Sequence, residues 1–185
     1  KLKWLKVHLI PEGSRTARGS SISNMIQLEE GEKISSFVNV NDFSKGYLVM
    51  CTKKGIIKKT ALEHFSRPRK GGIIALQLGE GDELINVVKT DGTDQILIPT
   101  RNGIAVKFKE TDIRPMGRTA RGVKGIRLKG DDSVVDMVKG DDTKSLLTIS
   151  EKGYGKRTKI SEYRLISRGG GGVINLKCND KTGKV

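Results

Sequence analysis

Four stretches of the chain combine arginine or lysine with glycine and serine and contain no acidic residue. They span residues 14–28, 66–78, 113–130 and 163–178 and include RTARGSS, RPRKGG, GRTARGVKG and SRGGGG; we refer to them as the basic windows. A guanidinium group offers a planar fork of N–H donors that suits phosphate oxygens, and small neighbours let backbone N–H groups approach the same oxygens. The windows therefore predict a phosphate-binding surface. The candidate contact residues are Arg15, Arg18, Arg67, Arg69, Lys70, Arg118, Arg121, Lys124, Arg164 and Arg168.

The overall charge points to the same kind of partner. The chain of 185 residues has 35 Lys and Arg against 21 Asp and Glu, a net charge of +14, which favours a polyanion such as nucleic acid or an anionic membrane surface. We expect no membrane contact, because no apolar run approaches the length of a bilayer span and no amphipathic helix accompanies the charge. Aromatic residues make up only 4 %, which disfavours stacking on single strands. Double-stranded DNA is the predicted partner.

The basic windows recur because the chain is a repeat of about fifty residues. One marker reads KGIIKK at 54–59, NGIAVK at 102–107 and KGYGKR at 152–157, at spacings of 48 and 50 residues. Each marker lies between two short apolar runs, and a K-G or N-G turn in that setting predicts a β-hairpin.

Each unit is predicted to hold four short strands, which in the second unit are 47–52, 56–60, 73–78 and 84–89. A period of 40–50 residues with four strands is typical of propeller blades. Independent small domains are disfavoured, because fifty residues bury too little apolar area. We predict an all-β fold of the β-propeller or β-pinwheel type, a single partial domain of about four blades. Its units are approximately 1–44, 45–92, 93–142 and 143–185.

The first unit begins inside a repeat, with residues 4–10 expected to form the last strand of a hairpin. Together with the absence of a starting Met, this predicts a piece of a larger protein. Acidic turns (EEGE, GEGDE, GDD) follow the basic windows in the repeat, so blades arranged around an axis would place the windows along one curved stripe. A protein-interaction propeller that docks an acidic partner, or a generic anion-binding surface, would use the same stripe. The single RGGGG segment is too short for an RNA-binding Arg-Gly tract.

The reactive side chains form no recognisable catalytic or metal site. Cys51 and Cys178 are predicted to be inert strand thiols, and His8 and His64 have no C-x-x-C pair or nucleophile nearby in sequence. GEGD is not followed by G-K-S/T, so no phosphate loop is predicted. Trp4 is expected to pack between blades. We therefore predict no catalytic residue and no cofactor in this chain.

Several segments resemble the C-terminal domain of the DNA gyrase A protein, with the corresponding protein of topoisomerase IV as the nearest relative. The most specific of them are GRTARGVKGIRL (117–128) and GYGKRT (153–158). Further similarity lies in LKVHLIPEGSRTARG (5–19), GIIKKTALEHFSR (55–67) and GDELINV (81–87).

The resemblance implies a six-bladed pinwheel with strand exchange between blades and a positive wrap of DNA around its rim, so that strand passage introduces negative supercoils. It implies a parent type II topoisomerase that contains two copies each of gyrase A and gyrase B, acts on the bacterial chromosome in the cytoplasm, and uses ATP and Mg²⁺ outside this chain. The cleaving tyrosine lies elsewhere in gyrase A, and Tyr47, Tyr154 and Tyr163 do not match its motif.

One family feature is missing. The basic box Q-R-R-G-G-x-G of the first gyrase blade does not occur, and SRGGGG at 167–172 lacks the arginine pair and lies in another repeat. By alignment of blades the box would precede Lys1. A parent like topoisomerase IV, with a degenerate box, is the alternative. GYGKRT and the regular repeat favour gyrase.

Overall fold

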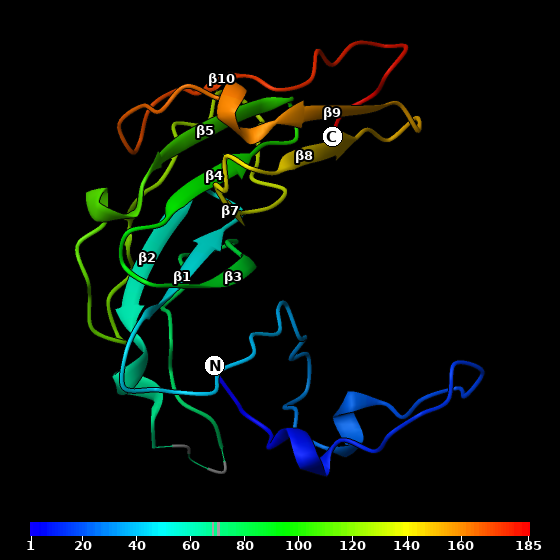
Figure 1. The fold of residues 1–185 in the computed structure, drawn as a ribbon, viewed down its shortest axis with the longest axis vertical. Helices are drawn as coiled ribbons and strands as arrows, with labels where there is room; N and C mark the ends of the chain where they lie inside the picture. The colour runs from blue at the N-terminus through cyan, green and yellow to red at the C-terminus, as the bar shows by residue number, and fades with distance from the viewer. Residues whose placement is uncertain (68, 70) are drawn as a thin grey trace.

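The computed structural model describes residues 1–67, 69 and 71–185, and its regular elements there are β-strands and single-turn 3-10 helices (Figure 1). The strands are β1 (Tyr47–Thr52), β2 (Ile56–Ala61), β3 (Leu84–Thr90), β4 (Gln95–Pro99), β5 (Ile104–Lys109), β6 (Val123–Lys124), β7 (Val138–Lys139), β8 (Ser145–Ile149), β9 (Gly155–Lys159) and β10 (Val173–Ile174). The 3-10 helices are η1 (Val7–Leu9), η2 (Ile22–Asn24), η3 (Leu62–Phe65), η4 (Glu110–Asp112) and η5 (Ile160–Glu162). Across the described ranges, no helix has the length and apolar character that would let it cross a membrane.

The strands form three antiparallel sheets that follow one another along the long axis of the molecule (Figure 1). The first has the order β3-β1-β2-β6, the second the order β10-β5-β4-β7, and the third consists of β8 and β9. The hairpins β1–β2, β4–β5 and β8–β9 occupy the same place in the second, third and fourth units. The all-β, propeller-type prediction is confirmed.

The fourth strand of each complete sheet comes from the next unit along the chain. β6 of the third unit pairs with β2, and β10 of the fourth unit pairs with β5. A single bridge between Leu2 and Ile73 makes the same connection between the first and second units. The prediction of a strand at 73–78 within its own blade was wrong, because this segment crosses to the preceding unit and pairs there at only one position.

The first unit also differs from expectation. Residues 4–10 contain η1 and no strand, and their side chains are mostly exposed, so the strand predicted there was wrong. Trp4 packs on Phe43, with ring centroids 5.8 Å apart, and Phe43 in turn packs against the hydrophobic cluster of the second unit. The strands predicted at 47–52 and 84–89 coincide with β1 and β3 to within one residue.

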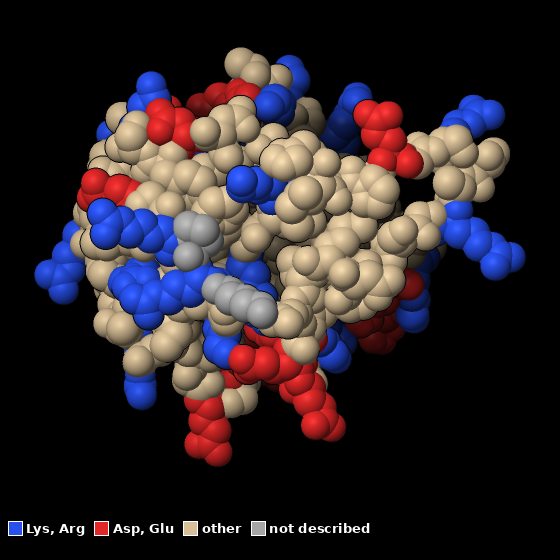
Figure 2. All heavy atoms as spheres, turned by 90° about the horizontal axis from the view of Figure 1, so that it is seen from below, with Lys and Arg blue, Asp and Glu red and all other residues tan. Residues whose placement is uncertain are grey.

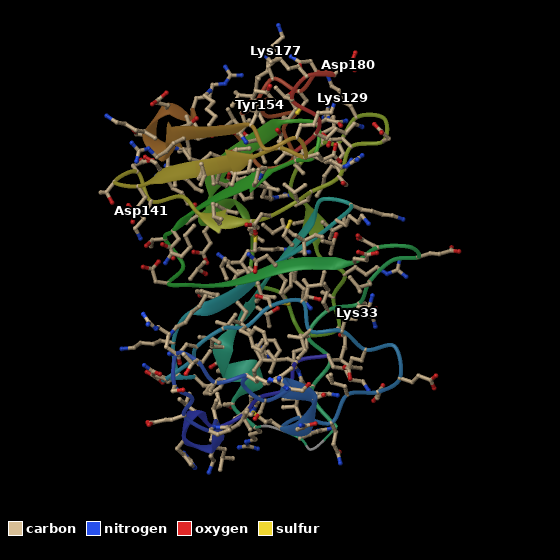
Figure 3. The ribbon with its side chains drawn as sticks, turned by 90° about the vertical axis from the view of Figure 1, so that its right-hand side faces the viewer. Lys33, Lys129, Asp141, Tyr154, Lys177 and Asp180 are labelled. Atoms are coloured by element: carbon tan, nitrogen blue, oxygen red, sulfur yellow. The ribbon has the colours of Figure 1, made fainter. Side chains whose placement is uncertain are left out.

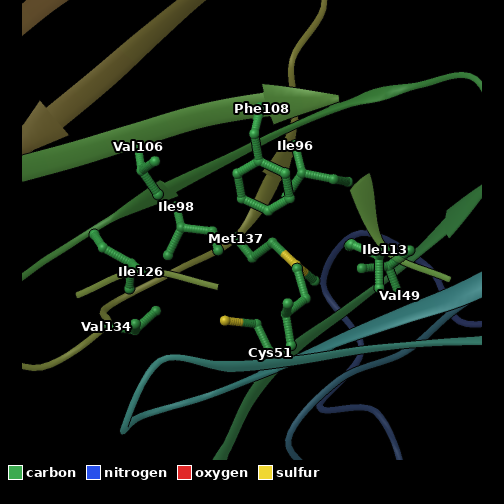
Figure 4. Packing of buried hydrophobic residues seen from close by; sticks show 11 residues of the cluster. Val49, Cys51, Ile96, Ile98, Val106, Phe108, Ile113, Ile126, Val134 and Met137 are labelled. Atoms are coloured by element: carbon green, nitrogen blue, oxygen red, sulfur yellow. The ribbon is translucent and has the colours of Figure 1, made fainter. Parts of the chain in front are cut away.

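Each gap between neighbouring units is filled by its own hydrophobic cluster. β1 directs Val49 and Cys51 into the gap toward β4 and β5, and directs Leu48 and Met50 into the gap toward the first unit. Figure 4 shows the larger of these clusters, which includes the fully buried Phe108. A strand that is buried on both faces has a nearly continuous run of apolar residues, as β1 has. Burial raises the pKa of the Cys51 thiol to about 12, in agreement with an inert role.

The turn of the β4–β5 hairpin lies against the next unit. Gly103 has φ +79°, and its backbone approaches the neighbouring chain so closely that a Cβ atom there would lie 2.0 Å from the carbonyl oxygen of Leu176. The equivalent glycine of the fourth unit, Gly153, has nearly the same φ of +78° but nothing within 4 Å of that position. The two glycines therefore share a turn conformation but differ in what packs on it.

Candidate nucleic-acid interface

The second, third and fourth basic windows each contain a crossing segment, which begins in its own unit and pairs with the preceding one. In the third window, backbone hydrogen bonds fix both ends of the crossing segment. Met116 N–H donates to the Lys59 carbonyl (2.8 Å), and Gly125 N–H donates to the Gly55 carbonyl (2.7 Å). In Figure 1 the yellow-green segment after η4 runs from the middle sheet down beside β2. The sheet exchange therefore brings basic residues of neighbouring units together.

The second and third windows meet at a hollow of about 390 Å³. Arg67 and Arg69 from the second window and Arg118 from the third line it, together with Glu63, His64 and Ser66. We call this site the arginine hollow. Figure 2 shows several Lys and Arg side chains gathered on the left of the face that is seen from below. Lys70, another predicted contact, lies outside the described residues.

The third and fourth windows meet through their backbones. Gly169 N–H donates to the Gly125 carbonyl (2.7 Å), and Arg127 N–H donates to the Gly170 carbonyl (2.9 Å). Arg168 reinforces this contact, with Nε donating to the Asp112 carbonyl (3.1 Å) and Nη1 to the Lys124 carbonyl. Arg168 thus uses part of its guanidinium to hold two units together, a role that its sequence context did not indicate.

The other predicted contacts are exposed. They are Arg15, Arg18, Arg121, Lys124 and Arg164. The loop with Arg15 and Arg18 belongs to the N-terminal segment, which extends away from the sheets in Figure 1. Three of the four windows therefore form a contiguous surface, and the first is set apart from it.

The arginines of the windows remain free of acidic partners within the described residues. The ion pairs found there use cations outside the predicted set: Lys1, Lys3, Lys53, Lys59, Arg101, Lys107, Lys139, Lys144 and Lys184. The guanidinium groups can therefore take phosphate oxygens without first breaking a salt bridge.

The acidic turns have a structural use, because their carboxylates hold the hairpin turns. Asp82 accepts hydrogen bonds from the backbone N–H groups of Lys54 and Glu83 (both 2.9 Å), and so holds the β1–β2 turn. Asp132 does the same for the β4–β5 turn, accepting from Asn102 N–H at 2.8 Å. Lys129 directly precedes the acidic turn that contains Asp132. Figure 3 shows Asp141, which lies in a different acidic turn, on the opposite side of the ribbon from Lys129.

A lysine that sequence reasoning missed contacts the backbone of Arg118, one of the residues of the arginine hollow. Lys58 has a fully buried side chain on β2, and its Nζ donates to the carbonyl oxygens of Ala75 (2.7 Å) and Arg118. Burial lowers the pKa of this ammonium to about 8. Residues 57–60 are all buried, so strand alternation contained no signal for the direction of this side chain.

Among the described residues, one group of three carboxylates lies close enough to hold a cation: Asp91, Asp94 and Glu110. The buried Glu110 already accepts hydrogen bonds from the Thr90 hydroxyl (2.6 Å) and from the backbone N–H groups of Gly92 (3.1 Å) and Asp94 (3.2 Å). These bonds account for both of its oxygens, so the cluster is explained by the turn that it holds.

A family profile described as "DNA gyrase C-terminal domain, beta-propeller" matches residues 1–41, 46–91, 94–139 and 144–185. The chain is 49 % identical over 129 residues to the DNA gyrase A protein of Salmonella typhimurium, and 48 % identical over 122 residues to that of Clostridium acetobutylicum. These alignments cover 69 % and 65 % of the chain but 15 % of each relative, so the chain corresponds to a small part of the curated relatives it matches.

Solved structures show the same architecture. The C-terminal domain of DNA topoisomerase IV superposes with a TM-score of 0.81 at 30 % identity, covering 90 % of this chain and 52 % of that one. The C-terminal domain of DNA gyrase A gives 0.79 at 28 % identity, covering 91 % and 57 %.

Proposed function

Because this chain belongs to the DNA gyrase C-terminal domain family, we propose that it binds duplex DNA through its basic windows and bends it around the edge of the blade array. The observation that carries the proposal is that arginines of neighbouring units meet at one hollow and on one contiguous surface. Such a surface contacts the phosphate backbone and does not read base sequence. Bending the stiff duplex costs several kcal/mol, on the order of 1–6, which many distributed phosphate contacts offset.

In this proposal the chain supports an enzyme without containing its chemistry. The parent is the DNA gyrase A protein, part of a type II topoisomerase that works in the bacterial cytoplasm on the chromosome together with gyrase B. Gyrase B and the rest of gyrase A provide ATP hydrolysis, Mg²⁺ and strand cleavage. The duplex held here is then presented to them, and strand passage introduces negative supercoils.

Topoisomerase IV remains the second candidate parent, since its C-terminal domain superposes as well as that of gyrase. The sequence relatives favour gyrase, because the matches at 49 % and 48 % identity are gyrase A proteins. Supercoiling of relaxed plasmid by the reconstituted complex distinguishes the two, since only a gyrase introduces negative supercoils in such an assay.

Wrapping is tested by titrating the chain with duplexes of increasing length in a mobility-shift assay. The affinity is expected to rise with length until the duplex spans the contiguous windows, because each added contact neutralises another phosphate. An affinity that does not depend on length would contradict wrapping. Equal affinity for duplex DNA, RNA and heparin would favour a generic anion surface instead.

Replacing Arg118 and Arg121 by Ala is expected to weaken binding to all DNA sequences alike. Each change should also reduce the steepness of the salt dependence by about 1 in the slope of log K against log salt. The measurement is fluorescence anisotropy at several salt concentrations. The matched control is Arg101→Ala, which removes the same charge from a residue that is paired with Glu151 (2.9 Å) outside the windows, and should leave the slope unchanged. A loss confined to one DNA sequence would argue against backbone contacts.

A further inference from the structure

Lys58 differs from the other buried lysines of the blades in what its ammonium contacts. Lys59 lies 3.7 Å from a carboxylate oxygen of Glu110, and Lys107 lies 2.8 Å from that of Asp142. For Lys58 the described residues provide two backbone carbonyls and no acidic partner. A buried charge without a counter-ion is costly. Its presence therefore requires a reason other than packing.

The repeat itself shows that the blade does not need a lysine here. In the third unit the equivalent position on β5 is Val106, which pairs with Ile98 as Lys58 pairs with Met50. Val106 is fully buried in the hydrophobic cluster between the sheets. An apolar β-branched side chain thus satisfies the same site in the same fold.

The fourth unit has a lysine at the equivalent position, Lys156, but its surroundings differ from those of Lys58. Lys156 is exposed, and its Nζ lies 3.4 Å from the Asn175 carbonyl, the counterpart of the Lys58 contact with Ala75. It has no second bond to a neighbouring window in the described residues. The contact that distinguishes Lys58 is the one to Arg118.

We propose that Lys58 is a positioning residue for DNA binding: its ammonium ties the second window to the third through the Ala75 and Arg118 carbonyls and so fixes Arg118 over the arginine hollow. This inference rests on the proposed function. The bond to the Arg118 carbonyl restrains the backbone from which the guanidinium extends. The charge of Lys58 adds to that of the arginines of the hollow, so a bound polyanion would supply the counter-ion that the described residues do not provide. Restraining a contact residue in the free state reduces the ordering cost of binding.

The test compares Lys58→Val with Lys156→Val. Both variants remove one positive charge from the same strand position, and both introduce the residue that the third unit already has. Lys58→Val is expected to lower the affinity for a long duplex about tenfold, as for loss of a charged hydrogen bond, and Lys156→Val by less than about twofold. Equal effects of the two variants would mean that only the net charge matters, and would overturn the proposal.

A double-mutant cycle separates positioning from general destabilisation. If Lys58 acts through Arg118, then Lys58→Val should add less than about twofold to the loss caused by Arg118→Ala. Losses that multiply independently would overturn the proposal. Thermal unfolding of each variant monitors folding, and Lys58→Met replaces Lys58→Val if the latter does not fold. A wild-type chain that does not bind duplex DNA would refute the proposed function, whereas normal binding with an unchanged Lys58→Val affinity would refute only this inference.

Discussion

Raising the salt concentration from 50 to 200 mM is expected to lower the affinity of the chain for a long duplex by about four orders of magnitude. If about 8 phosphates are neutralised, log K falls against log salt with a slope near −7, because each neutralised phosphate releases condensed counterions. The prediction depends on the free arginines, since a cation already held by a carboxylate would release few counterions on binding. The described window arginines form no such ion pair. Fluorescence anisotropy with a labelled duplex measures the slope.

The size of the slope distinguishes two modes of binding. If only the arginine hollow engages DNA, its three arginines give a slope of about −3. A slope near −7 requires that contacts extend along the contiguous windows of the second, third and fourth units. The control is a duplex so short that it can contact only the arginine hollow. Its salt dependence should keep the shallow slope of about −3. A steep slope with the short duplex would mean that the contacts are not distributed along the surface.

Substituting Gly103 by Ala is expected to destabilise the fold by about 3 kcal/mol or more. The new Cβ would lie 2.0 Å from the Leu176 carbonyl oxygen and 2.9 Å from Cys178 Sγ, so the fourth unit must shift away from the β4–β5 turn. The positive φ adds about 1 kcal/mol of backbone strain. Chemical denaturation followed by circular dichroism measures the loss, with the midpoint and slope reported separately.

Gly153→Ala is the matched control for this variant. It has the same turn and a φ within one degree, but open space where its Cβ would be, so it should lose only the backbone strain of about 1 kcal/mol. The difference between the two variants measures the contact between the third and fourth units. Equal losses would mean that this contact contributes little to stability.

Local signals predicted the hairpins well. The strands β1 and β2 follow from apolar runs on either side of a Lys-Gly turn, and that information lies within 15 residues of sequence. The crossing segments could not be assigned in the same way. Ile73 pairs with Leu2, about seventy residues earlier, and Val123 pairs with Ile57, so nothing in either short segment identifies its partner.

The candidate site was predicted in outline and not in detail. The repeat predicted that Arg118 has the same position within its unit as the second window has within its own. Only the crossing segment explains why Arg118 lines the same hollow as Arg67 and Arg69. Arg168 matched the pattern equally well, yet its guanidinium donates to two carbonyls of the third unit. Lys58 gave no signal, because its neighbours on the strand are buried as well. Which of the predicted cations contact DNA stays a prediction.

The crossing segments also determine how the array responds to substitution. Units that merely stack can tilt when surface side chains change, since only van der Waals contacts set their angle. Here main-chain hydrogen bonds join neighbouring units. Met116 N–H donates to the Lys59 carbonyl (2.8 Å), and Ile166 N–H donates to the Lys107 carbonyl (2.9 Å). The arrangement of neighbouring units is therefore held largely by the backbone, so an exposed arginine such as Arg121 can be exchanged without breaking a bond between units, whereas exchanging Arg168 removes two of them.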